Sequence, residues 1–164
     1  MPTSSRTFHT RIDVPADRRQ ALVALLNQHL ADTFDLYGQI KQAHWNVKGT
    51  QFYQLHKLFD DLAGQVLDHV DEIAERAVAL GGTALGTVRL AAAASRLAEY
   101  PLDAGGSMQH VEAVAVRFAA LAATTRSSIE AANGLGDADT ADLFTEVSRE
   151  LDKGLWLLDA HLQA

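Results

Sequence analysis

Four long segments of this 164-residue chain carry apolar residues at steps of three and four, the spacing of one face of an α-helix. Glycine-containing breaks separate them, at residues 48–50, 81–82, 105–106 and 134–136. The pattern predicts helices over about residues 17–46, 51–80, 107–133 and 139–162, with a short extra helix over about 88–98. The chain contains only 3 prolines, so helices of this length can run without interruption.

Short breaks join the first helix to the second and the third to the fourth, whereas residues 83–106 form a long connection able to traverse a bundle. This order of connections is typical of the ferritin-like four-helix bundle. We therefore expect an all-α fold, a ferritin-like four-helix bundle over residues 16–164, with the short extra helix in the connection between the second and third helices. Residues 1–15 lack a helical period and are predicted to be a mobile N-terminal tail.

The amino-acid composition limits the kinds of functional site that the chain can form. The chain has no cysteine, which excludes disulfides, thiolate ligands and cysteine nucleophiles. Any metal must be held by oxygen and imidazole, a donor set that favours iron, manganese or zinc. The net charge of −7 argues against a generic nucleic-acid binder. No stretch approaches the roughly 18 consecutive apolar residues of a membrane span, and the first residues hold no secretory signal, so we expect a cytoplasmic location.

The second predicted helix carries a polar stripe on the side away from its apolar one. With about 100° per residue and His56 at zero, Asp60 lies at about 40°, Asp71 at about 60° and Glu75 at about 100°. The apolar residues fall between about 200° and 320°, so the stripe faces away from this chain's own core. A polar helix face is equally typical of a surface that meets only water.

Two details favour a binding site. His56 with Glu75, and Asp60 with Asp71, are symmetric about one point, and Gly64 lies beside that point. Glycine lowers helix stability but lets another backbone approach closely. Asp60 and Asp71 lie about 16 Å apart along the axis, and His56 and Glu75 about 28 Å, so one chain cannot gather all four around one ion. Two copies packed antiparallel about a twofold axis would form two equivalent sites.

His44 ends the first predicted helix, next to the loop that leads to His56. Alone it is more typical of a packed or capping histidine; beside His56 it becomes a second imidazole ligand. Two imidazoles and three carboxylates suit ferrous iron or zinc, with open positions for an oxidant. The Glu-x-x-His pattern that builds di-iron sites inside one bundle does not occur in the sequence, which again favours a site between chains.

These residues lie in longer segments that resemble the Dps family, the DNA-binding proteins from starved cells. The likeness covers about residues 21–163. It is carried by the His-Trp-Asn-Val-Lys-Gly segment at 44–49, by Phe52 with His56 and Asp60, and by residues 71–76, 140–144 and 151–156.

The resemblance implies a hollow shell of twelve subunits that oxidises Fe(II), preferably with hydrogen peroxide, and stores a ferric mineral. It thus implies an enzyme, a ferroxidase, that protects against oxidative stress. The implied metal is iron, at dinuclear-type sites between twofold-related subunits; zinc, which suits the same donor set, is expected as a substitute. The implied ligands are His44, His56 and Asp60 from one chain, and Asp71 and Glu75 from its twofold mate.

Other residues have weaker indications. Trp45 lies beside a ligand, and the matching family tryptophan is proposed to take up oxidising equivalents; a packing role is equally consistent. Asp142, together with Asp137, lies where the family lines threefold iron-entry pores. Carboxylates are favoured at helix N-termini in any case, so capping is the stronger interpretation for Asp137.

Two alternatives compete with the ferroxidase hypothesis: a nucleoid-compacting DNA-binding protein with a secondary metal site, and a plain helical oligomer with an incidental zinc site. The first twelve residues contain Arg6 and Arg11 but no lysine, and the net charge of −7 per chain repels phosphate. We expect weak DNA binding at neutral pH, improving below about pH 6.5 as histidines such as His9 gain charge.

Overall fold

The computed structural model describes residues 6–163 of the chain. Over this range it contains no strand and five helices: α1 (Ala16–Asn46), α2 (Phe52–Ala79), α3 (Val88–Ala94), α4 (Ser107–Gly134) and α5 (Ala138–Leu162). Both ends of each long helix lie within one residue of the expected position. The predicted all-α four-helix bundle with a short extra helix is confirmed.

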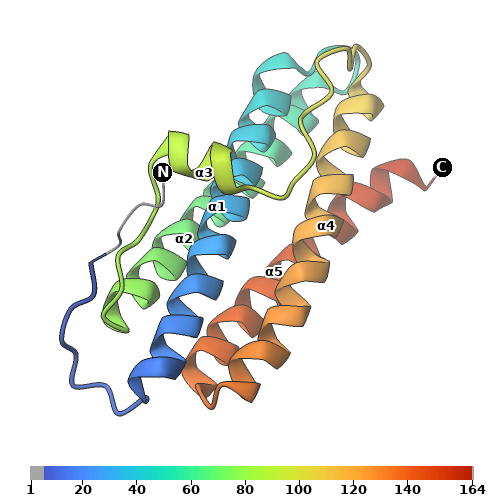
Figure 1. Cartoon of the computed structure of the whole chain (residues 1–164). Helices are drawn as coiled ribbons and strands as arrows, with labels where there is room; N and C mark the ends of the chain where they lie inside the picture. Colours follow the sequence, from blue (N-terminus) through green and yellow to red (C-terminus); the bar gives the residue numbers. More distant parts are fainter. Residues whose placement is uncertain (1–5, 164) are drawn as a thin grey trace.

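Figure 1 shows two antiparallel pairs, α1 with α2 and α4 with α5, lying side by side. The connection after α2 runs back along the whole bundle before α4 begins, and α3 lies part of the way along it. Gly81, at the end of α2, has φ +86° and ends the helix as expected. None of the helices in the described range is both long and apolar enough to cross a membrane.

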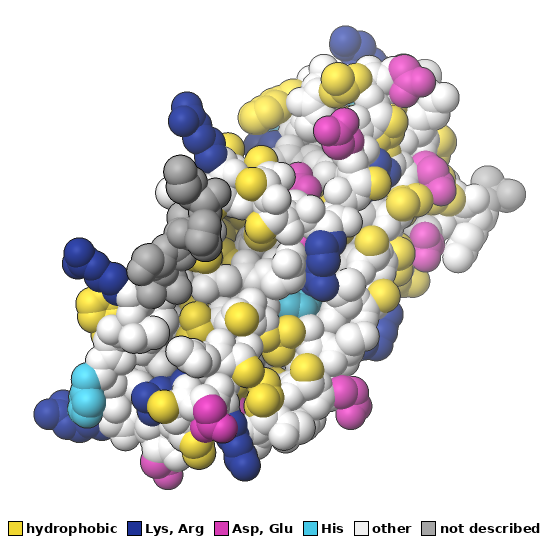
Figure 2. All heavy atoms as spheres, in the orientation of Figure 1, with side chains coloured by type: hydrophobic (Ala, Val, Ile, Leu, Met, Phe, Trp, Pro, Cys, Tyr) yellow, Lys and Arg dark blue, Asp and Glu magenta, His cyan; other side chains and the backbone are white. Residues whose placement is uncertain are grey.

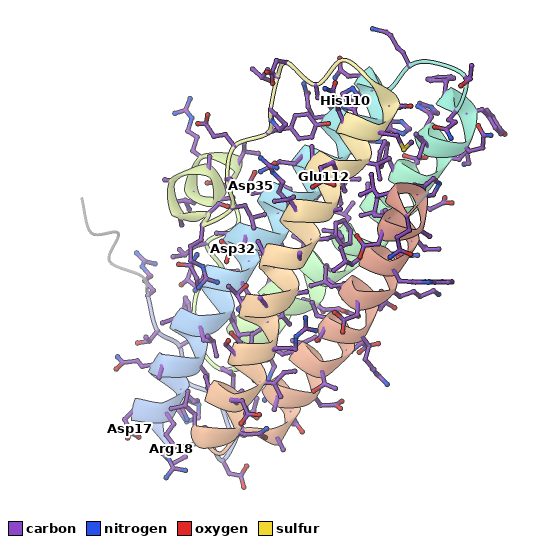
Figure 3. The ribbon with its side chains drawn as sticks, turned by 90° about the vertical axis from the view of Figure 1, so that its right-hand side faces the viewer. Asp17, Arg18, Asp32, Asp35, His110 and Glu112 are labelled. Carbon is purple, nitrogen blue, oxygen red and sulfur yellow. The ribbon has the colours of Figure 1, made fainter. Side chains whose placement is uncertain are left out.

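One stripe of α1 holds this connection in place, as Figure 3 shows for the labelled Asp32 and Asp35. The Asp32 carboxylate accepts hydrogen bonds from the Arg96 guanidinium (2.6 Å) and the Arg96 backbone N–H (2.7 Å), and Asp35 accepts one from Ser95 Oγ (2.6 Å). Helix α3 ends at Ala94, four residues before the expected end. The difference arises because Asp32 takes the backbone N–H of Arg96, which a longer helix would use internally.

The core lies between the two helix pairs. Phe59, Phe118 and Phe144 are its largest fully buried side chains. A Cβ at Gly154 would lie 2.7 Å from Phe118 Cε1, so α5 can pack this closely on α4 only with glycine at that position. The core also encloses one fully buried histidine, His29.

The segment before α1 is extended and lies against the connection that follows α2. The Phe8 backbone N–H donates to the Gly81 carbonyl (2.8 Å), and the Thr83 hydroxyl donates to the Arg6 carbonyl (2.8 Å). Residues 1–5 of the predicted tail lie outside the described range. Residues 6–15 contain no helix, as expected, and their mobility stays a prediction.

Candidate metal centre

The two histidines at the junction of α1 and α2 lie in direct contact. The rings of His44 and His56 stack with centroids 3.8 Å apart and planes inclined by 18°. His44 Nδ1 lies 2.8 Å from the His56 carbonyl, and His56 Nδ1 lies 2.9 Å from the His44 carbonyl. A carbonyl only accepts, so each Nδ1 carries a hydrogen, and each neutral ring keeps a free lone pair on Nε2. The backbone carbonyl of each histidine thus fixes the orientation of the other histidine's ring.

Asp60 lies one helical turn beyond His56 and completes this half of the predicted ligand set. Its Oδ1 is 3.8 Å from His44 Nε2, and its side chain is 46% exposed. The structure therefore brings together three of the five predicted ligands, two imidazoles and one carboxylate, at one end of the α1–α2 pair.

Lys41 also reaches this group, a contact that the sequence analysis missed. Its ammonium lies 2.8 Å from Asp60 Oδ1 and 5.9 Å from the centroid of the Trp45 ring. The hydrogen bond from Lys41 holds the pKa of Asp60 below its ordinary value, so the carboxylate is ionised. Lys41 lies one turn before His44 on α1, but no pattern within that helix indicates that Asp60 of α2 lies beside it. Lys41 thus places a positive charge among the predicted metal ligands.

Asp71 and Glu75 lie three to four turns further along α2, exposed on its surface. Because α2 is one continuous helix, these carboxylates stay far from His44, His56 and Asp60 within the chain. Over residues 6–163 no three histidine or acidic side chains are arranged to hold a metal ion.

Of the auxiliary residues, Trp45 is 65% exposed beside the histidine pair, and Asp142 is exposed in the second turn of α5. Asp137 is buried, and Arg76 binds both of its carboxylate oxygens at 2.8 Å. Burial raises the pKa of Asp137, but hydrogen bonds from Thr140 and Arg76 outweigh it and leave the pKa below the ordinary value. Asp137 occupies the N-cap position of α5, where capping was expected, and its carboxylate is held mainly by the side chains of Thr140 and Arg76.

A further histidine, for which the sequence indicated no partner, links α2 to α5. His69 is buried between two carboxylates, with Nδ1 2.9 Å from Glu72 and Nε2 2.9 Å from Glu150. The contact of His69 with Glu72 could have been predicted from the sequence, because Glu72 follows three residues later on the same helix face. Glu150 could not, because it lies 81 residues away.

Comparisons with known proteins identify the family to which the chain belongs. Residues 23–164 match the ferritin-like domain. The DNA protection during starvation protein of Agrobacterium fabrum (strain C58 / ATCC 33970) is 42% identical over 158 residues, which are 96% of this chain and 98% of that protein.

Comparison with solved structures identifies the same family. DpsA14 from Streptomyces coelicolor superposes with a TM-score of 0.91 at 30% identity, covering 98% of this chain and 96% of that one. A DPS protein from Vibrio cholerae O1, described as a member of a broad superfamily of ferritin-like diiron-carboxylate proteins, has a TM-score of 0.87 at 26% identity, covering 94% of this chain and 97% of that one. With a domain match over most of its length and a 42% identical relative that spans nearly all of both chains, this protein belongs to the Dps family of ferritin-like proteins.

Proposed function

We propose that the protein is a ferroxidase, which oxidises Fe(II) and stores the ferric product inside a shell built from its own copies. The observation that carries the proposal is the reciprocal pair of His44 and His56, in which Nε2 of His44 lies 3.8 Å from the Asp60 carboxylate. Both rings are oriented before any metal arrives, which reduces the cost of ordering them on binding.

The rest of the ligand set comes from a second copy of the chain. Asp71 and Glu75 are exposed on the same helix as His56 and Asp60 but too far along it to reach the same ion. An antiparallel twofold arrangement of two α2 helices places Asp71 opposite Asp60 and Glu75 opposite His56. The assembly is a homo-oligomer, which we expect to contain twelve subunits, and each site needs two of them.

Ferrous iron is the substrate of this reaction and hydrogen peroxide the oxidant. One peroxide takes one electron from each of two Fe(II) ions, takes up two protons, breaks its O–O bond and leaves as two waters. The carboxylates favour the ferric product, because their negative charges stabilise the more highly charged ion. Consuming ferrous iron and peroxide together limits oxidative damage. Zinc fits the same donors but has no redox chemistry, so it acts as an inert substitute.

Stopped-flow oxidation tests the proposal. Protein loaded anaerobically with Fe(II) is mixed with peroxide, and the rate of ferric absorbance and the particle size are measured. Asp71→Asn should slow oxidation at least about tenfold by removing one anionic ligand. Asp61→Asn, an exposed carboxylate on the same helix outside the ligand set, should leave the rate unchanged. Equal rates for both variants and the wild type would refute the site.

Complementation tests the division of the site between chains. A His56→Ala chain co-expressed with a Glu75→Ala chain gives mixed dimers in which one site carries both lesions and the other carries none. Mixed assemblies should therefore recover oxidation that neither variant shows alone. Recovery no greater than that of the single variants would refute an intersubunit site.

DNA binding is the second candidate function, favoured by the name of the Agrobacterium relative, DNA protection during starvation protein. On the face in Figure 2, the basic side chains of the described residues are spread among acidic ones and form no continuous patch. With a net charge of −7 per chain, we expect weak DNA binding at neutral pH and nucleoid association only in more acidic conditions. A gel shift at neutral pH decides this, since tight retention lost on deleting residues 1–12 would establish the second function. Either activity places the protein in the cytoplasm.

A further inference from the structure

A tyrosine and a histidine outside the proposed ligand set form a close hydrogen-bonded pair. The Tyr100 hydroxyl lies 2.5 Å from Nδ1 of His110, and the two rings are inclined by only 20°, with centroids 6.1 Å apart. His110 is 3% exposed, and Tyr100 is half-buried in the long connection that leads to α4. The chain has 3 tyrosines, and in the described structure only the Tyr100 hydroxyl contacts a group that can take up its proton.

The surroundings of the pair keep the tyrosine protonated and the histidine neutral. Burial raises the pKa of Tyr100 to about 12, although the nearby Arg117 guanidinium opposes the rise. Burial lowers the pKa of His110, and the positive charge of Lys48 lowers it further. The Tyr100 hydroxyl has no other acceptor among the described residues, so it donates its hydrogen to the lone pair of Nδ1. The pair is therefore a phenol whose proton already points at a neutral base.

The pair lies at the end of the bundle that holds the candidate metal centre. Figure 3 shows His110 near the start of α4, and Figure 1 shows this start at the end of the bundle where α1 meets α2. Ser107, one turn before His110, donates a hydrogen bond to Oε1 of Gln51, the residue before α2 (3.4 Å). Because α4 packs on α1, the pair and the stacked rings of His44 and His56 are separated by a distance on the order of 10 Å. An electron can cross such a distance, whereas the phenol cannot bind the metal.

The contact with His110 makes Tyr100 a better one-electron donor than an isolated tyrosine. A phenol that loses an electron becomes a strong acid, so the electron leaves more easily when a base accepts the proton at the same time. His110 is such a base and is already in position. Arg117 donates hydrogen bonds to the Ala98 and Glu99 carbonyls, which fixes the backbone directly before Tyr100. The fold thus holds the tyrosine and the base in the geometry that this reaction needs.

We propose that Tyr100 and His110 form a redox couple that stores one oxidising equivalent when peroxide meets a single Fe(II). The inference rests on the proposed function, which supplies the iron and the peroxide. Peroxide needs two electrons, and two protons from solvent, to leave as two waters. One electron comes from Fe(II) and the other from Tyr100, whose proton passes to His110 and leaves a neutral tyrosyl radical beside an imidazolium. A second Fe(II) later returns an electron to the radical and His110 returns the proton, so no hydroxyl radical is released.

Photo-oxidation without iron tests the couple by itself. A flash-generated ruthenium(III) tris-bipyridine complex is a one-electron oxidant in solution, and electron paramagnetic resonance identifies the residue that is oxidised. In a Tyr37→Phe/Tyr53→Phe background Tyr100 is the only tyrosine, and a tyrosyl radical should form. His110→Gln keeps a hydrogen-bond acceptor but removes the base, and should slow radical formation about tenfold.

The matched control retains a different tyrosine. In a Tyr37→Phe/Tyr100→Phe background only Tyr53 remains, 71% exposed and without a histidine against its hydroxyl in the described structure. There His110→Gln should leave the rate of radical formation unchanged. An equal effect of His110→Gln in both backgrounds, or no effect in either, overturns the proposal.

Freeze-quenched samples test the role of the couple during iron oxidation. Protein loaded anaerobically with one Fe(II) per proposed site and mixed with peroxide should give a tyrosyl radical. Tyr100→Phe should abolish this radical, and Tyr53→Phe should retain it. With two Fe(II) per site, both electrons come from iron, so Tyr100→Phe should oxidise iron at the wild-type rate. A radical that persists in Tyr100→Phe, or that resides on a tryptophan in the wild type, overturns the proposal.

The iron-free experiment allows the two hypotheses to fail separately. Radical formation at Tyr100 that depends on His110, in a protein that does not oxidise iron, supports the couple and refutes the ferroxidase. Rapid iron oxidation in a protein whose Tyr100 radical forms independently of His110 overturns the couple and leaves the ferroxidase standing.

Discussion

Acid should destabilise the protein through His29, which is fully buried in the bundle core. Its Nε2 lies 2.6 Å from the Ser128 hydroxyl, and its ring centroid lies 4.7 Å from that of Phe144. The Ser128 hydroxyl donates to the Thr124 carbonyl, so it accepts from the imidazole, and the neutral ring carries its hydrogen on Nε2. A second proton would leave a charge in this apolar site.

Burial lowers the pKa of His29 from 6.5 to about 4, while the nearby Asp32 raises it and Arg96 lowers it. The folded-state pKa lies below the unfolded-state value, so the unfolded chain takes up the proton first as the pH falls. The contribution of neutral His29 to the free energy of unfolding is therefore fully present above pH 6.5. It is lost as the pH falls from 6.5 to about 4. Each pH unit within this window lowers the free energy of unfolding by about 1.4 kcal/mol, so the titration of His29 lowers it by about 3 kcal/mol per chain in total.

Urea unfolding of wild type and His29→Gln separates this effect from the titration of carboxylates, which both proteins share. Near neutral pH the wild type should be the more stable by about 1 kcal/mol, because the variant loses the contact with Phe144. At about pH 5 the order should reverse, since the wild type has by then lost about 2 kcal/mol through His29. His9→Gln, at an exposed histidine, should follow the wild type. Stability curves of wild type and His29→Gln that fall in parallel would refute the reasoning.

Three further changes have expected outcomes. Lys41→Met frees an Asp60 oxygen and removes a positive charge, so Zn(II) should bind about tenfold more tightly by calorimetry; weaker binding would show that the lysine supports the site. Thr33→Val should change the free energy of unfolding, measured with urea, by less than about 1 kcal/mol, because the buried Thr33 hydroxyl has no hydrogen-bond partner in the described structure. A larger loss would reveal a partner, such as an internal water. Arg96→Met leaves the buried Asp32 carboxylate short of its partner and should lower the unfolding free energy by about 2 kcal/mol, with increased proteolysis near α3; an unchanged midpoint would contradict this.

Most of the fold could be predicted from the sequence because its signals are local. Each long helix repeats its apolar positions every three to four residues, and glycines that adopt positive φ, such as Gly81 and Gly136, lie at helix ends. The end of α3 could not be predicted in the same way. It depends on Asp32, 64 residues before Arg96 in the chain, and no local pattern reports that contact.

The difference between local signals and contacts of distant residues also explains which parts of the candidate site could be predicted. The loop between α1 and α2 is short, so the approach of His44 to His56 followed from chain connectivity. The contact of Lys41 with Asp60 depends on how two helices pack, and a pattern within one helix does not contain it. The pairing of Asp71 and Glu75 with a second copy stays a prediction, because it concerns a contact between chains.

The reciprocal bonds of His44 and His56 give the loop between them an unusual role. Loops are normally the parts of a protein that best tolerate insertion. Here one extra residue between α1 and α2 would slide one carbonyl away from the ring that it orients and, by the same shift, release the other ring. We therefore expect the length of the five-residue segment 47–51, which carries none of the proposed ligands, to affect metal affinity at the proposed site as strongly as the histidines themselves. Engineered insertions for display or fusion belong in other loops of this protein.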